Sequence, residues 1–189
     1  LSYISDNNQV IILELFLSNN NFSILRKIIL SEINSIDALV MPSPDKIIFS
    51  DHKSSTIFEY APSIDRCISL LEYGRGGKGK VRCPGNLIIH NDSIFLCDRH
   101  NYLIQNFSLD GTFLRQVGGK GRRCNQFDLP WDIISLDNNN LLVADKNNDR
   151  ISLLNNDNFR VEEILISRQF LPSQLARPTS MCSVSNNIY

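Results

Sequence analysis

Basic side chains are concentrated in one part of this 189-residue sequence. Residues 74–125 carry nine Lys and Arg side chains against three acidic ones, although the whole chain has a formal net charge of −1. Cations gathered in glycine-rich segments attract anionic partners, and arginine adds a planar group that binds phosphate or carboxylate oxygens in pairs. The residues that we single out for RNA or ligand binding are Arg75, Lys78, Lys80, Arg82, Arg99, His100, Tyr102, Lys120, Arg122, Arg123, Lys146 and Arg150.

Two kinds of partner fit these residues. With single-stranded or hairpin RNA, the Lys and Arg side chains would contact phosphates, and the rings of His100, Tyr102 and Trp131 would stack on unpaired bases. A protein ligand that contacts the same residues is the alternative. A third reading treats the charges as solvated loop residues with no specific role, and Trp131 as a packing residue.

Asp51, Asp98 and Asp145 stand 47 residues apart, and each closes a short apolar run. We expect each carboxylate to accept hydrogen bonds from the backbone amides of the loop that follows, which makes these aspartates structural turn residues. A ring of carboxylates that holds a metal is the alternative. It lacks further ligands, because the three histidines share no repeat position and none has zinc-like spacing to a cysteine. We therefore expect no metal and no cofactor.

Motifs of catalysis are missing from the sequence. It contains no GxSxG motif and no phosphate loop that ends in GK[ST]. The run 76–79 (Gly-Gly-Lys-Gly) looks like a phosphate cradle, but no helix is expected after it, and a similar run follows at 118–121. We therefore expect this segment not to be an enzyme.

The spacing of the aspartates reflects a repeat of 45–47 residues, and each period divides into four short strands. In the best copy, strands are expected at 131–136, 141–144 and 150–154, with a fourth that ends near 166 and polar turns between them. Helical periodicity is absent. The sequence thus predicts an all-β fold, a β-propeller of four-stranded blades over residues 1–189. The blade periods are approximately 1–30, 31–73, 74–117, 118–166 and, in part, 167–189.

The repeats resemble NHL repeats. The resemblance rests on the glycine-rich segment 118–121, the stretch 126–132 (Gln-Phe-Asp-Leu-Pro-Trp-Asp) and the stretch 142–151 (Leu-Val-Ala-Asp-Lys-Asn-Asn-Asp-Arg-Ile). The preceding copy matches at 76–79, 97–101 and 110–114. The resemblance is strong over residues 74–165 and weak before residue 50. Asn125, the displaced Gly85 and Asp149 depart from the family pattern.

The resemblance is greatest to the NHL propellers of tripartite-motif proteins. It implies a ring of six blades, of which this chain would be a fragment of about four, although closure as a four-bladed ring stays open. It also implies a binding platform for RNA in post-transcriptional regulation. The alternative is a protein-interaction or substrate-recruiting module of a RING-type ubiquitin ligase, whose ligase region would lie elsewhere in a longer chain.

The cysteines indicate a cytoplasmic protein. The five cysteines form no CxxC pair, which is typical of reduced thiols inside the cell. Three glycosylation triplets, at Asn21, Asn91 and Asn106, would favour secretion, but such triplets arise by chance in an Asn-rich chain. No apolar stretch is long enough to span a bilayer, and neither a signal peptide nor an oligomeric state is evident.

Overall fold

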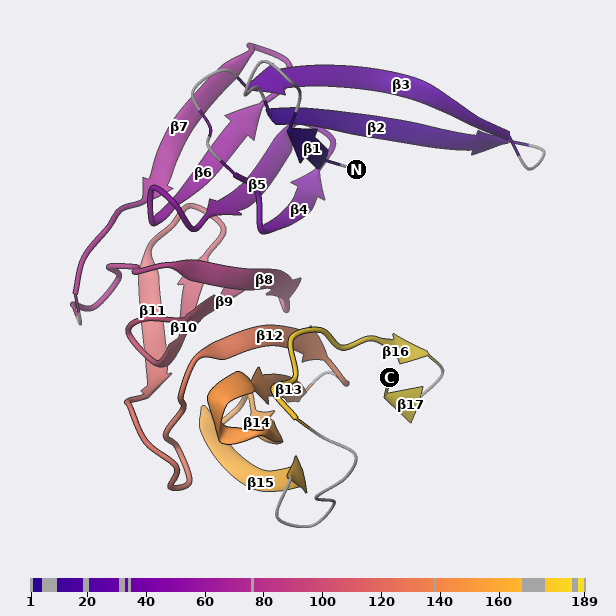
Figure 1. The fold of residues 1–189 in the computed structure, drawn as a ribbon. Coiled ribbons are helices and arrows are strands. Elements are labelled where there is room, and N and C mark those ends of the chain that lie inside the picture. Colours follow the sequence, from indigo (N-terminus) through magenta and orange to yellow (C-terminus); the bar gives the residue numbers. More distant parts are fainter. Residues whose placement is uncertain are drawn as a thin grey trace.

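The computed structural model is all-β (Figure 1), and it describes residues 2–4, 10–18, 21–30, 33, 35–75, 77–137, 139–167, 176–184 and 187–188. Within these ranges the one helical segment is a single 3-10 turn, η1 (Lys146–Asn148). No helix in the described part of the chain is long and apolar enough to cross a membrane.

Three four-stranded antiparallel sheets follow one another along the chain, and in each the strands are ordered as in the sequence. They consist of β4 (Ala38–Ser43), β5 (Lys46–Asp51), β6 (Thr56–Ala61) and β7 (Arg66–Leu71); β8 (Pro84–His90), β9 (Ser93–Asp98), β10 (Leu103–Ser108) and β11 (Phe113–Gly118); and β12 (Pro130–Ser135), β13 (Asn140–Asp145), β14 (Arg150–Asn155) and β15 (Arg160–Ser167).

Two smaller sheets flank these three. The strands β1 (Ser2–Ile4), β2 (Val10–Ser18) and β3 (Asn21–Leu30) come first, and β16 (Ser183–Val184) and β17 (Asn187–Ile188) come last. Figure 1 shows the sheets following one another in an arc, and β8 contacts β4 on one side and β12 on the other. The first strands of successive sheets thus lie side by side, as in a β-propeller. The predicted fold class is confirmed. The blade periods and the six-bladed ring stay predictions, and the outer periods 1–30 and 167–189 lie partly outside the described residues.

The second strand of each four-stranded sheet is buried almost throughout. In β5, β9 and β13 a half-buried residue is followed by five buried ones. Each strand lies between two strands of its own sheet, and its two faces pack against neighbouring sheets. Phe95 of β9 therefore shares one apolar cluster with Ile133 and Val143 of the next sheet. Each such side chain stabilises the fold by about 1.5–3 kcal/mol.

A buried aspartate ends each second strand and ties two loops together. The carboxylate of Asp98 accepts the backbone N–H of Arg82 (2.8 Å), in the loop before the sheet, and the side-chain amides of Asn101 (2.8 Å) and Gln105 (2.7 Å). Arg82 and Asn101 belong to different loops, so the carboxylate holds the loop before the first strand against the loop after the second.

The equivalent aspartates in the neighbouring sheets are also bound. Asp145 accepts the backbone N–H of Asp128 (2.7 Å) and the side chains of Asn148 (2.7 Å) and Arg150 (2.8 Å). Asp51 instead accepts backbone N–H groups of its own loop, from Lys53 (2.9 Å) and Ser54 (3.4 Å). Asp51 therefore bonds within the loop that follows it, as expected from the sequence, and Asp98 also accepts a backbone hydrogen bond from Asn101 of its own loop. Asp98 and Asp145 in addition bind the preceding loop and the side chain of the Asn three residues later.

The buried position of Asp98 makes the stability of the protein depend on pH. Burial raises the pKa of its carboxyl group from 3.8 to about 6, against the opposing effect of its hydrogen bonds. Between about pH 4 and pH 6 the folded state therefore binds a proton that the unfolded state has released. The contribution of Asp98 to the free energy of unfolding falls as the pH rises through this window.

We predict that Asp98→Asn removes this contribution. Urea unfolding at pH 4 and pH 7 measures the change. The free energy of unfolding of the wild type should fall over this interval by up to about 3 kcal/mol more than that of the variant. The exposed Asp92→Asn controls for the change in net charge and should behave as the wild type. An unchanged pH dependence in Asp98→Asn would contradict the assignment.

Candidate functional site

The loops that precede the first strands and the loops between second and third strands lie together at one edge of the sheets, called the loop edge below. The backbone N–H of His100 donates to the carbonyl of Arg82 (3.1 Å), and that of Lys146 to the carbonyl of Leu129 (3.2 Å). The basic residues predicted from the sequence are therefore brought to the same edge.

These residues differ in how far they reach solvent. Arg99 and Arg150 are buried, and Arg82, Tyr102 and Lys146 are half-buried. The others are exposed: Arg75, Lys78, Lys80, His100, Lys120, Arg122 and Arg123. Two of the exposed cations have partners within the chain. The ammonium group of Lys80 lies 3.6 Å from the carboxylate of Glu72, and that of Lys120 lies 5.2 Å from the ring centre of Tyr102.

The guanidinium group of Arg150 is bound within the protein. Besides Asp145, it donates to the carbonyls of Arg122 (2.9 Å) and Arg123 (3.3 Å), and its side chain is 4% exposed. Arg150 thus holds the basic loop that precedes β12, and its donors face the protein and not a ligand.

The first strands of successive sheets begin with the same backbone conformation. A residue with positive φ precedes the proline that begins β8 (Cys83, 53°) and the one that begins β12 (Leu129, 58°), and Arg177 (49°) precedes Pro178 in the segment before β16. A β-bulge follows the proline in β8 and in β12. This shared geometry turns the residues after the proline toward the space between the sheets. The corresponding residues of the sheet before β8 are Asp37 and Ala38, which pair with the end of β5.

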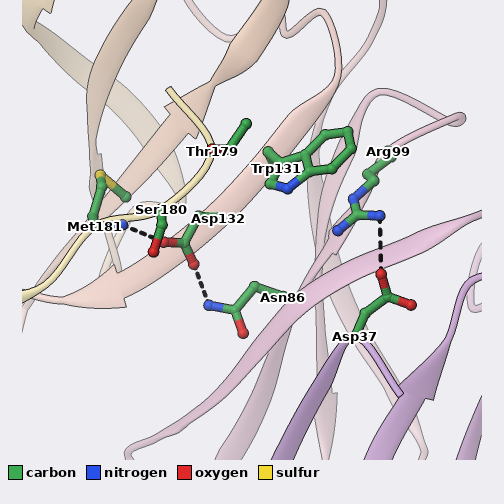
Figure 2. A pocket seen from close by; sticks show the side chains of 8 residues that line it. All are labelled: Asp37, Asn86, Arg99, Trp131, Asp132, Thr179, Ser180 and Met181. Atoms are coloured by element: carbon green, nitrogen blue, oxygen red, sulfur yellow. Dashed lines mark hydrogen bonds and ion pairs between the residues drawn. The ribbon is translucent and has the colours of Figure 1, made fainter. Parts of the chain in front are cut away.

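These repeat-equivalent positions converge on one pocket at the loop edge, with a volume of about 260 Å³. Figure 2 shows the side chains that line it, which come from three successive four-stranded sheets with their loops and from the segment before β16. They are Asp37, Asn86, Arg99, Trp131, Asp132, Thr179, Ser180 and Met181. Most of these side chains are polar. They include two carboxylates, of Asp37 and Asp132, and the guanidinium group of Arg99.

Arg99 spans the pocket because Gly85 lies beneath it. A Cβ atom at Gly85 would lie 2.6 Å from Nε of Arg99, closer than such contacts occur, so only glycine leaves room for this side chain. Arg99 bonds to Asp37 of the preceding sheet (3.3 Å) and lies over the Trp131 ring of the next (3.8 Å to its centre). It therefore connects three sheets.

The two carboxylates of the pocket are bound by neighbouring groups. Asp37 lies 2.6 Å from Nδ1 of His52 in addition to its bond with Arg99. Asp132 accepts the side-chain amide of Asn86 and the backbone N–H of Met181 (2.6 Å). Burial raises the pKa of Asp132, and these hydrogen bonds oppose the increase.

Trp131 is contacted by a second cation. The ammonium group of Lys146 lies 3.3 Å from the centre of its ring. Desolvation, followed by the charges of Arg177 and Arg99, lowers the pKa of Lys146. Two cations therefore contact one indole ring, and a third, Arg177, acts on Lys146.

The sequence singled out Arg99, Lys146 and Trp131 but missed most of the pocket. His52, Arg99 and Lys146 each directly follow one of the three repeated aspartates, and Asp37 stands 94 residues, or two periods of 47, before Trp131. Aligning the periods by column would have brought Asp37 and Asp132 into consideration. It would not have shown that Gly85 makes room for Arg99, because this depends on packing.

Metal-binding clusters are absent from the part of the chain that the structure describes. No three His, Cys, Asp or Glu side chains there are placed to hold one ion. The five cysteines are free thiols.

Comparison with known proteins places the fold more firmly than the function. No protein-family model and no curated protein sequence matches the chain. The solved nidogen/laminin complex contains a chain that is 18% identical, with a TM-score of 0.67 over 92% of this chain and 62% of that one. Streptogramin B lyase follows at 15% identity and a TM-score of 0.63 over 93% and 52%.

A third similar structure is an auxiliary nutrient binding protein from Bacteroides ovatus, with 13% identity and a TM-score of 0.61 over 96% of this chain and 53% of that one. The chain thus spans between half and about three fifths of the length of these solved chains. At such identities the likeness shows the fold, a β-propeller, and leaves NHL membership as an expectation.

The expectation that this segment is not an enzyme is corrected. Streptogramin B lyase and the virginiamycin B lyase of Staphylococcus aureus are enzymes of similar fold. The absence of familiar catalytic motifs therefore does not exclude catalysis, because proteins of similar fold include enzymes. The likeness assigns no reaction to this chain.

We predict that Gly85→Ala displaces Arg99 and opens the pocket. Trp131 is the only tryptophan of the chain, so quenching of its fluorescence by acrylamide reports on its surroundings. The variant should lose about 1–3 kcal/mol of stability through the forced shift, and Trp131 should be quenched more readily. Gly77→Ala is the matched control, because its Cβ would meet only the flexible side chain of Lys80. Equal quenching in the two variants would rule out the proposed position of Arg99.

Proposed function

We propose that this chain is part of a propeller that binds a protein partner at the loop edge and anchors it in the pocket around Arg99. The observation that carries the proposal is the convergence of residues from three successive sheets and from the segment before β16 on one polar pocket. A cavity of this size accommodates a side chain of a partner, while the exposed loops around it supply the rim of an interface.

The state of the aromatic rings favours a protein over RNA. Sequence-specific recognition of RNA usually stacks unpaired bases on free rings. Here Trp131 is contacted by Arg99 and Lys146, and Tyr102 by Lys120. The chain of similar fold in the nidogen/laminin complex belongs to a complex of two proteins, which supports a protein partner for this architecture without naming one.

The proposal is tested with a photo-crosslinking amino acid at Thr179, an exposed residue of the pocket. Mass spectrometry of adducts formed in an extract identifies the partner, which is then purified. Its affinity should fall at least about tenfold in Ser180→Phe, where an exposed pocket residue becomes a ring that fills the cavity. The same crosslinker at Ser63, between β6 and β7, is the control. A partner that binds Ser180→Phe as well as the wild type would contradict the proposal.

RNA binding in an NHL protein of the tripartite-motif type, acting in the cytoplasm, is a second candidate. The observation in its favour is that Arg75, Lys78, Arg122 and Arg123 are exposed, and none has an ion-pair partner among the described residues. Such cations are available to neutralise phosphates.

For this candidate we expect the double variant Arg122→Ala and Arg123→Ala to bind RNA more weakly. The slope of log affinity against log salt should flatten by about 1.4, because each phosphate contact to a single strand contributes about 0.7. Filter binding over a salt series measures both. The control replaces Arg66 and Arg160, exposed at the starts of β7 and β15, and should keep the wild-type slope. Equal slopes in both double variants would exclude the basic loops as the RNA site.

A further inference from the structure

The two carboxylates of the pocket already accept hydrogen bonds from the protein. Both carboxylate oxygens of Asp132 accept hydrogen bonds, one from Asn86 and the backbone of Ile133 and the other from the backbone of Met181. Both oxygens of Asp37 are bound as well, one by Arg99 and the other by His52. A ligand that enters the pocket therefore finds no free carboxylate.

The donors of the pocket are largely unused. Arg99 bonds to Asp37 through one terminal nitrogen and also interacts with the thiol of Cys83, but its Nε has no partner, and its side chain is only 8% exposed. In Figure 2 the other terminal nitrogen turns away from Asp37 toward the space between Trp131 and Asn86. The indole nitrogen of Trp131 lies on the edge of the ring nearest this space and has no hydrogen bond to any described residue.

Positive charge accompanies these donors. Arg99 and Lys146 both contact the Trp131 ring, and Arg177 lies close enough to act on Lys146. The carboxylates of Asp37 and Asp132 oppose them, but their oxygens are bound as described. The exposed hydroxyl groups of Thr179 and Ser180 form no hydrogen bond with the described residues, so they are available to a ligand.

We infer that the pocket binds a carboxylate, presented by an aspartate or glutamate side chain of the protein partner. This inference rests on the proposed function and specifies its ligand. A carboxylate accepts from the free donors of Arg99 and from the indole N–H, and it offsets the cations around Trp131. A basic side chain would find both carboxylates already bound and would be repelled by the cations around Trp131, and a neutral amide would leave the positive charge uncompensated.

Short capped peptides test the inference directly. Acetyl-Gly-Glu-Gly-amide and its Gln and Lys counterparts are titrated into the protein at constant ionic strength, with Trp131 fluorescence as the readout. The Glu peptide should bind about tenfold more tightly than the Gln peptide, because charge-assisted hydrogen bonds are about twice as strong as neutral ones, and the Lys peptide should not bind.

Variants locate the binding. Lys146→Gln should weaken the Glu peptide several-fold, and Ser180→Phe should abolish its binding. Lys53→Gln removes an exposed cation from another loop of the same edge and should leave the affinity unchanged.

Three outcomes would overturn the inference. The Gln or Lys peptide binds as tightly as the Glu peptide, or Glu binding survives Ser180→Phe, or no peptide binds. The proposed function is judged separately, because the partner crosslinked through Thr179 would still lose affinity in Ser180→Phe if the pocket recognises something other than a carboxylate.

Discussion

A buried carboxylate at the end of the second strand determines how the loop edge is built. Asp98 and Asp145 each bind one loop before the sheet and one loop within it. Burial of a carboxylate is costly unless its oxygens accept hydrogen bonds, so the loops cannot separate from it without losing that compensation. The residue that follows each aspartate is thereby directed toward the space between the sheets, and Arg99 and Lys146 reach Trp131 from these positions.

The pocket at this edge arises from small departures between otherwise similar repeats. Where one sheet has Trp131, another has Gly85, and a third has Asp37. The missing side chain at Gly85 allows Arg99 to lie across its own sheet and contact both neighbours. A repeat fold thus produces an asymmetric site by changing residues at a single column, while the buried second strands stay alike.

The sequence predicts the repeated features of this protein better than the unique ones. Strands at 131–136, 141–144 and 150–154 were expected, and β12, β13 and β14 occupy nearly these ranges, because alternating apolar runs and polar turns are local signals. The burial of Arg99 and Arg150 was not predicted, since each has a partner far away in the sequence, Asp37 at 62 residues for Arg99 and Gln126 at 24 residues for Arg150. From the sequence both arginines were expected to bind a ligand, and only the packing of the folded chain shows which groups their N–H donors bind.

The central claim is that the donors around Trp131 form a site for a negatively charged acceptor. The indole N–H of the single tryptophan gives one signal in a proton–nitrogen NMR spectrum, and this signal reports on the claim directly. Titration with acetate at constant ionic strength should move it saturably, and acetamide should move it far less. An indole N–H signal that does not shift with acetate, or that shifts equally with acetate and acetamide, would contradict the account.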